Sequence, residues 1–190
     1  MTITHPELVR ALAKPGAAIA ESMTAQSADL LHHAVGVSGE CGELLEALTA
    51  YPIGIDRVNL VEELGDLEFY LEGFRQNLGI ERAATVTAND NEVMGYGVFT
   101  TTAHLAVSAS KLLDLAKKVV IYEKEVVCAP FVIELQKFER LLNAIRFYLD
   151  ITREETIEGN IAKLQVRYAA GSYSNQQAQT RADKADEAAA

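Results

Sequence analysis

The chain has 190 residues, 49% of them hydrophobic, which is enough for one ordinary domain or two small halves with a buried core. Its formal net charge of −10, with no block of lysines or arginines, excludes a nucleic-acid polymer as a partner. No apolar run approaches the roughly 18 residues of a membrane span, so we expect no membrane association. Cys41 and Cys128 lie in apolar helical surroundings without a secretory signal, which predicts buried thiols in a cytoplasmic protein.

Helical patterns run through most of the chain. Proline occurs only four times, alanine, leucine and glutamate are abundant, and no long alternating pattern of the kind typical of strands appears. We therefore predict an all-α fold. Ser27 or Asp29 is the expected cap of the first long helix, which is broken near Pro52 and Gly54. The predicted helices cover residues 27–50, 57–78, 81–88 and 99–127, a segment opened by Pro130, and 153–168.

This pattern divides the chain into five parts. They are an N-terminal lead-in helix at 1–26, a helical repeat at 27–90, a linker at 91–98, a second helical repeat at 99–170 and a polar C-terminal tail at 171–190. The tail ends in NQQAQTRADKADEAAA, which is polar and rich in alanine. We expect it to be a frayed helix or disordered, with no core of its own.

The two central parts are related in sequence. When the chain is shifted along itself without gaps until His33 coincides with His104, identical residues coincide more often than chance allows. This shift, the repeat offset, predicts a duplicated helical unit. The alternative is that two unrelated amphipathic helices happen to be in phase. The other coinciding pairs include Tyr51 and Tyr122, Glu63 and Glu134, Arg75 and Arg146, and Arg82 and Arg153.

Two pairs of acidic residues lie beside the predicted core. In the first long helix, Glu40 and Glu43 lie along one edge of the apolar stripe, whereas Glu46 points to the opposite side. In the second, Glu63 and Asp66 occupy the corresponding edge of a leucine stripe. If the two helices pack antiparallel, these edges bring four carboxylates together.

Four neighbouring carboxylates repel one another and raise one another's pKa unless a cation joins them. Oxygen ligands without cysteine or histidine at matching spacing favour Mg²⁺, with Mn²⁺ as a substitute, over zinc. Gly42 and Gly65 lie within the two acid pairs, where each costs its helix roughly 1 kcal/mol relative to alanine. We interpret them as making room for a close approach at a metal site. The alternative is a solvated helix edge.

Two other interpretations concern the same region. A di-iron carboxylate bundle also carries acids on facing helices, but its ExxH pairs are missing here. His32 and His33 precede the acids by about two helical turns and could approach a ligand. We favour the simpler interpretation, in which they are histidines at a helix interface with their hydrogen bonds satisfied.

The acid pairs belong to longer segments that resemble a known family. These segments are LLHHAVGVSGECGELLEAL, NLVEELGDLEFYLEGFRQNLGI and NIAKLQVRYAAGSYS. They are similar to the three consensus blocks of MazG-like all-α NTP pyrophosphohydrolases, of the type common in bacteriophages. The resemblance implies a Mg²⁺-dependent enzyme that cleaves a nucleoside triphosphate into a monophosphate and pyrophosphate. It implies that the metal ligands are Glu40, Glu43, Glu63 and Asp66.

The same resemblance assigns roles to other residues. Lys163, Arg167 and Tyr168 in the NIAKLQVRY block would bind the triphosphate, and Lys163 and Arg167 would also stabilise charge during catalysis. Either Glu40 or Glu43 would act as general base, and the pattern leaves open which of them does so.

One departure from the family pattern concerns the chain order. A long segment, which forms the first part of the second repeat, separates the ExxD helix from the NIAKLQVRY block. The acid cluster is degenerate in that repeat, because the counterparts of the four acids are Lys111, Asp114, Glu134 and Lys137. We therefore expect a helical bundle that is a tandem pseudo-dimer, in which the second repeat supplies Lys163 and Arg167 to the metal site of the first.

Two alternatives remain open at this point. A dUTPase-like enzyme of the same superfamily would share the acids and differ in the base and sugar that it accepts. A non-catalytic helical interaction protein would use the acids only for solubility. We also expect chains of this type to form a homo-oligomer, either in the cytoplasm of their own cell or, if phage-encoded, in that of the host.

Overall fold

The structure, a computed structural model, describes residues 3–49, 54, 56–84 and 95–184. Within these ranges the regular elements are all helical, which confirms the predicted all-α fold. The long helices are α3 (Ala25–Thr49), α4 (Arg57–Leu78), α5 (Gly97–Tyr122), α6 (Cys128–Leu149) and α7 (Arg153–Arg167). The shorter ones are α1 (His5–Leu12), α2 (Gly16–Ser22), η1 (Arg82–Ala84), α8 (Asn175–Thr180) and η3 (Ala182–Lys184).

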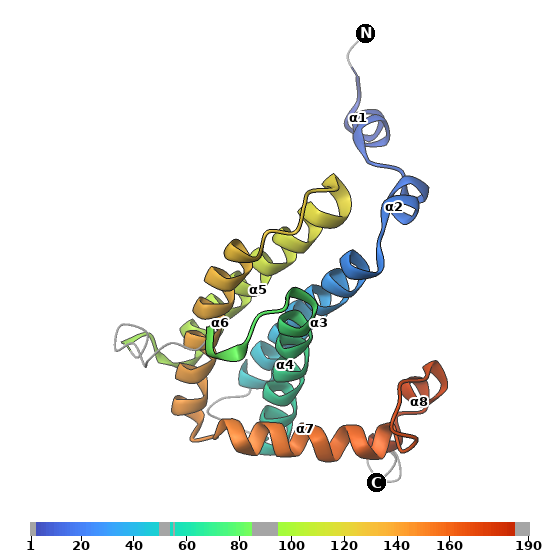
Figure 1. Cartoon of the computed structure of the whole chain (residues 1–190). Coiled ribbons are helices and arrows are strands. Elements are labelled where there is room, and N and C mark those ends of the chain that lie inside the picture. The colour runs from blue at the N-terminus through green and yellow to red at the C-terminus, as the bar shows by residue number, and fades with distance from the viewer. Residues whose placement is uncertain (1–2, 50–53, 55, 85–94, 185–190) are drawn as a thin grey trace.

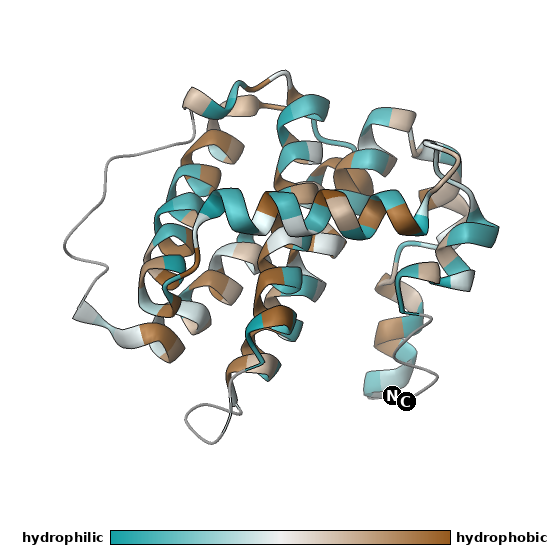
Figure 2. Ribbon diagram, turned by 90° about the horizontal axis from the view of Figure 1, so that it is seen from below, coloured by the Kyte–Doolittle hydropathy of each residue, from teal (hydrophilic) through white to brown (hydrophobic). Residues whose placement is uncertain are grey.

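Four long helices form a bundle. Helix α3 packs against both α4 and α5, and α6 packs against α5 (Figure 1). Helix α7 crosses one end of the bundle and lies on α4, as the view from that end shows (Figure 2). Helices α1 and α2 extend beyond the other end, and α1 has no buried residue.

The predicted apolar stripes form the core. Val37 and Leu44 of α3 and Leu64 and Leu71 of α4 are completely buried, as the 3.6-residue period requires for one face of each helix. They belong to one hydrophobic cluster that also includes Leu105 and other residues of α5 and α6. Within the described residues, no helix is both long enough and apolar enough to cross a membrane.

The helix boundaries follow the repeat offset seen in the sequence. Helices α4 and α6 have the same length, and the repeat offset places both ends of α4 on the ends of α6. Each is followed by a residue with a positive φ, Gly79 at 63° and Asp150 at 52°. In each case the next residue, Ile80 or Ile151, donates its backbone N–H to a carbonyl of the last helical turn. The two helices thus end in the same way.

Reciprocal ion pairs connect these two helices. Arg75 of α4 pairs with Glu139 of α6, and Arg146 of α6 pairs with Glu68 of α4. All four side chains are at most 5% exposed. At the repeat offset, Arg75 corresponds to Arg146 and Glu68 corresponds to Glu139. The two ion pairs are therefore equivalent, as in the isologous interface of a symmetric dimer, although both lie within one chain.

Each of these two glutamates has a second arginine nearby, but the two arginines bind with different strength. Arg153 donates to both carboxylate oxygens of Glu68 at 2.9 and 3.0 Å, whereas Arg82 lies 3.9 Å from Glu139. Burial alone would raise the pKa of Glu68, but the charges and hydrogen bonds of Arg146 and Arg153 lower it below its ordinary value. Glu68 therefore has better support than Glu139.

Several predicted boundaries differ from the structure. Helix α3 begins earlier than expected because Thr24 and Ser27 exchange backbone-to-side-chain hydrogen bonds of 2.9 and 3.1 Å, a capping arrangement without Asp29. Helix α5 begins within the predicted linker and ends at Tyr122, because Glu123 takes a left-handed conformation. Only a 3₁₀ turn, η1, represents the predicted helix at 81–88 in the described residues, and 85–88 lie outside them.

The C-terminal tail is more ordered than expected. Helix α8 and turn η3 fold back onto the bundle, where Asp183 binds Arg167 at 2.6 and 2.7 Å and Lys184 binds Glu62 at 2.8 Å. The expectation of a frayed or disordered end is therefore wrong up to residue 184, because ion pairs hold a segment that has no apolar core. Residues 185–190 lie outside the described residues.

The cysteine prediction holds for only one residue. Cys41 is 1% exposed in the core of α3, whereas Cys128 is exposed because it is the first residue of α6. The Cys128 thiol lies 3.6 Å from the carbonyl oxygen of Leu78.

The unequal support of the two glutamates predicts unequal effects of removing their partners. Replacing Arg75 with Met should lower the free energy of unfolding by about 3–5 kcal/mol, because it leaves Glu139 buried with only a distant arginine. The matched change Arg146→Met should lower the free energy of unfolding by clearly less, because Arg153 still binds Glu68. Urea unfolding followed by circular dichroism measures both values, and equal losses would contradict this account.

Candidate functional site

Three of the four predicted acids come together between α3 and α4. One carboxylate oxygen from each of Glu40, Glu43 and Glu63 lies within 4.8 Å of the others. Glu40 and Glu43 are three residues apart on α3, so their side chains leave the same edge of the helix. Glu63 reaches them from the neighbouring helix α4. Helical spacing and antiparallel packing predicted such a meeting for four acids, and the structure brings three of them together.

The three glutamates of the cluster differ in solvent exposure. Glu63 is 9% exposed, Glu40 is half-buried and Glu43 is exposed. A small ion could thus approach from the Glu43 side and contact a carboxylate that is shielded from water. Three oxygen donors at this separation fit the coordination chemistry of Mg²⁺ or Mn²⁺, which leave some positions to water or to a phosphate.

Electrostatics within the cluster favours a cation. Burial and the negative charges of Asp66, Glu43 and Glu63 raise the pKa of Glu40 to about 8, and a hydrogen bond with Glu63 contributes. Burial and the charge of Glu43 also raise the pKa of Glu63. In the absence of metal, a proton on Glu40 therefore relieves the repulsion near neutral pH, and a divalent cation could replace that proton.

Asp66, the fourth predicted ligand, faces α7. Its two oxygens accept hydrogen bonds from the side-chain amide of Asn160, at 2.6 Å, and from the ammonium of Lys163. Asp66 is not within the group of three close acids, although its charge contributes to the raised pKa of Glu40. It connects the acid cluster to the basic block, which lies 94 or more residues further along the chain.

Gly65 permits this connection. A Cβ atom at this position would lie 2.7 Å from the carbonyl oxygen of Thr156 and 2.9 Å from the Cβ of Asn160. Any side chain here would therefore push α7 away from α4 and separate Lys163 from Asp66. Gly42, in contrast, has no neighbouring atom within 4 Å, so the space beside Glu43 is open in this chain. One glycine admits another helix, and the other leaves free space.

The other predicted substrate-binding residues lie at the end of α7. Arg167 makes a two-point ion pair with Asp183 of the tail, which raises its pKa. The ring of Tyr168 lies 5.8 Å from that of Tyr173. The structure therefore places Lys163 beside Asp66, and it places Arg167 in an ion pair with the C-terminal tail.

His33 lies at the interface of α3 and α4, as the simpler interpretation predicts, but its buried Nδ1 makes no hydrogen bond within the described residues, and His32 is exposed. His33 packs against Gly73, where a Cβ would lie 2.2 Å from its imidazole, and its ring is 6.1 Å from that of Phe74. Burial, followed by the charge of His32, lowers the pKa of His33. His32 lies 5.7 Å, ring to ring, from Tyr70. Neither histidine belongs to the close group of acids.

The equivalent position in the second repeat has different chemistry. Glu134 accepts a hydrogen bond from Ser108 at 2.6 Å and lies 3.7 Å from the ammonium of Lys137. Burial and the neighbouring Lys111 lower the pKa of Lys137. Asp114 pairs with Lys118 at 2.6 Å, one turn along α5. Lysines therefore neutralise these acids, and within the described part of the chain the metal-type group of acids occurs only in the first repeat.

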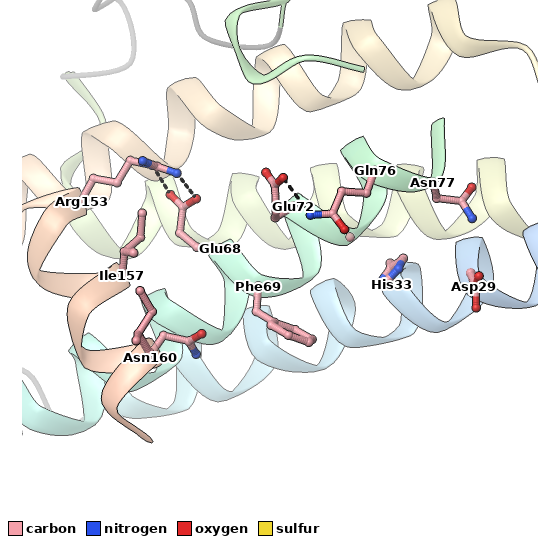
Figure 3. Close-up of a pocket in the computed structure, with 12 residues that line it drawn as sticks. Asp29, His33, Glu68, Phe69, Glu72, Gln76, Asn77, Arg153, Ile157 and Asn160 are labelled. Carbon is pink, nitrogen blue, oxygen red and sulfur yellow. Dashed lines mark hydrogen bonds and ion pairs between the residues drawn. The ribbon is translucent and has the colours of Figure 1, made fainter. Parts of the chain in front are cut away.

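A cavity of about 640 Å³ lies beside the site, between α3, α4 and α7 (Figure 3). Glu68 lines it, but Arg153 binds this carboxylate, as the dashed lines show. Asp29 and Glu72 also line it and make it unfavourable for a phosphate. Asn160 lines the same cavity and connects it with Asp66.

Sequence reasoning missed some residues of this site. Asn160 is the first residue of the NIAKLQVRY block. Its burial, at 7% exposed, and its hydrogen bond to Asp66 became visible only in the structure, so helical spacing did not identify it. Asp183 lies in a segment whose composition suggested disorder, so no pattern pointed to its pairing with Arg167.

Comparison with known proteins gives no further guide. No family model, no curated protein and no solved structure matches the chain.

The raised pKa of Glu40 predicts a pH-dependent stability in the absence of metal. Between about pH 5 and 8 the folded chain keeps a proton that the unfolded chain has lost, so its free energy of unfolding should fall as the pH rises through this interval. Saturating Mg²⁺ should reduce this slope, because the ion replaces the proton.

Urea unfolding in EDTA at several pH values measures the slope. Glu40→Gln should reduce the slope, because glutamine carries no charge at any pH, and the slope that remains comes from the raised pKa values of Glu63 and Glu139. Glu46→Gln, on the exposed side of α3, is the control and should leave the slope as in the unaltered chain. A slope as steep in Glu40→Gln as in the unaltered chain would contradict the assignment to Glu40.

Proposed function

We propose that this protein is a Mg²⁺-dependent nucleoside triphosphate pyrophosphohydrolase. The observation that carries the proposal is the meeting of two distant motifs: the close acids of α3 and α4, and Lys163 of α7, which binds Asp66 at their side. A cluster of acids by itself would suggest only a cation. The neighbouring lysine adds a group that binds phosphate, and the two together suit a charged phosphoanhydride.

The four acids would bind the metal ion and activate water. Glu40, Glu43 and Glu63 would hold the ion, and Asp66 would complete the set once its lysine turns to the substrate. A bound Mg²⁺ supplies neutralisation of the phosphates and a water of lowered pKa. Either Glu40 or Glu43 would accept the proton of the attacking water, since Glu43 is exposed and Glu40 is half-buried beside it.

The basic residues would act on the leaving pyrophosphate. Lys163 is 7% exposed in its side chain and already lies beside a carboxylate, so exchanging Asp66 for a phosphate oxygen keeps its charge paired. Arg167 could exchange the carboxylate of Asp183 for a phosphate in the same way, because both are two-point anionic partners for a guanidinium. Tyr168 follows at the end of α7.

We further propose that each chain is a tandem pseudo-dimer with one active centre. The equal offset of helix boundaries and the reciprocal ion pairs support the duplication. In the second repeat, the ammonium group of Lys137 lies next to Glu134, where the first repeat would hold the cation, and Lys111 neighbours Lys137. That half supports the structure and contributes α7 to the site of the first half.

Removal of a carboxylate should abolish most activity. Glu40→Gln and Glu63→Gln should each lower kcat at least about 100-fold with a nucleoside triphosphate and Mg²⁺, because losing one ligand costs several kcal/mol of transition-state stabilisation. The control Glu46→Gln should keep full activity. Ion chromatography should identify monophosphate and pyrophosphate as the first products, and orthophosphate as the first product would refute the proposed cleavage.

Lys163 should matter far more than a lysine in a similar pair elsewhere. Lys163→Ala should raise KM or lower kcat by at least about tenfold, because a charge-assisted contact with phosphate is lost. Lys118→Ala removes a lysine that also pairs with an aspartate, in the second repeat, and should leave turnover unchanged. Steady-state kinetics on both variants checks this, and normal turnover by Lys163→Ala would remove Lys163 from the mechanism.

A further inference from the structure

A second cavity, of about 460 Å³, lies on the side of α7 where the chain leaves this helix. Aromatic rings dominate its lining, and Gln165 and Ser172 add neutral polar groups. Among the described residues that line it, none is Asp, Glu, Lys or Arg. The aromatic lining consists of His32, Phe69, Tyr70, Tyr168 and Tyr173.

The rings come from two separate parts of the chain. His32, Phe69 and Tyr70 belong to α3 and α4, and the ring of Tyr70 lies 5.7 Å from His32 and 5.3 Å from Phe69 in edge-to-face arrangements. Tyr168 and Tyr173 come from the end of α7 and the loop that follows it. Tyr173 is 71% exposed, so most of its ring is available to a ligand.

Tyr70 joins this cavity to the acid cluster. It lies one helical turn after Asp66 on α4, and it packs on Gly36, one turn before Glu40 on α3. A Cβ atom on Gly36 would lie only 2.4 Å from the ring, so this glycine is what admits it. Burial, together with the negative charges of Glu40 and Asp66, raises the pKa of the Tyr70 hydroxyl.

We propose that this aromatic cavity binds the nucleobase of the substrate by stacking, while the polyphosphate extends past Tyr70 to the acids and Lys163. The proposal rests on the proposed function, since it assumes that the phosphates bind there. A lining without lysine or arginine offers no cationic partner to a phosphate but suits a flat neutral ring, and aromatic side chains stack on any base. Gln165 and Ser172 offer donors and acceptors to the edge of that base.

Kinetics with a panel of nucleoside triphosphates tests the assignment. Phe69→Ala and Tyr173→Ala should each raise KM by about 5- to 150-fold, the range expected when one stacking side chain is lost, with a smaller change in kcat. The matched controls are Phe147→Ala and Tyr122→Ala, which remove exposed rings from the second repeat and should leave KM unchanged. An unchanged KM in both cavity variants, with normal hydrolysis by the parent chain, overturns the inference and leaves the proposed function standing.

A binding measurement without phosphate separates the two proposals. Free nucleosides in EDTA should show saturation transfer from the protein to their base protons by NMR, weakened in Tyr173→Ala and retained in Glu40→Gln. If the parent chain hydrolyses no triphosphate, Tyr173-dependent binding of nucleosides still supports the cavity as a base site while the proposed function fails. The same transfer in the parent chain and Tyr173→Ala, or none in either, overturns the inference in that case.

Discussion

The close crossing of α7 over α4 at Gly65 is the contact on which the candidate site depends. There the backbone of α7 comes so near to α4 that a single methyl group would meet the carbonyl oxygen of Thr156. Because of this crossing, Asn160 and Lys163 reach Asp66, although the two motifs lie far apart in the sequence. A glycine that weakens its own helix by roughly 1 kcal/mol thus brings acidic and basic groups together.

The same crossing sets two electrostatic environments beside each other. On one side, Glu68 is held by two arginines and its pKa lies below the ordinary value. On the other, about one and a half helical turns earlier on α4, Glu63 faces other acids and its pKa is raised. Helix α4 therefore takes part both in a network of paired charges, with α6 and α7, and in a cluster of like charges, with α3. The first stabilises the fold, whereas in the second the carboxylates repel one another.

Much of the fold could be predicted from the sequence, because it depends on local periodicity. The leucine and valine stripes of α3 and α4 determine which edges face inward, and the acids follow from those edges by helical spacing. Long-range pairing was less accessible. Nothing in the composition of the tail indicated that Asp183 binds Arg167, and nothing in helical spacing placed Asp66 against α7 rather than among the other acids. The equal offset of Glu68 and Glu139 became meaningful only when both were seen opposite arginines with the same offset.

The two cysteines differ in a way that has practical value. The thiol of Cys41 is buried beside Glu40, and burial raises its pKa to about 12, so in the folded chain it is inert towards alkylating reagents near neutral pH. Cys128 is exposed at the start of α6, beside the end of α4. A maleimide dye would thus attach at one defined point of the natural sequence. Full labelling of both thiols would report that the helix carrying Glu40 and Glu43 had come apart.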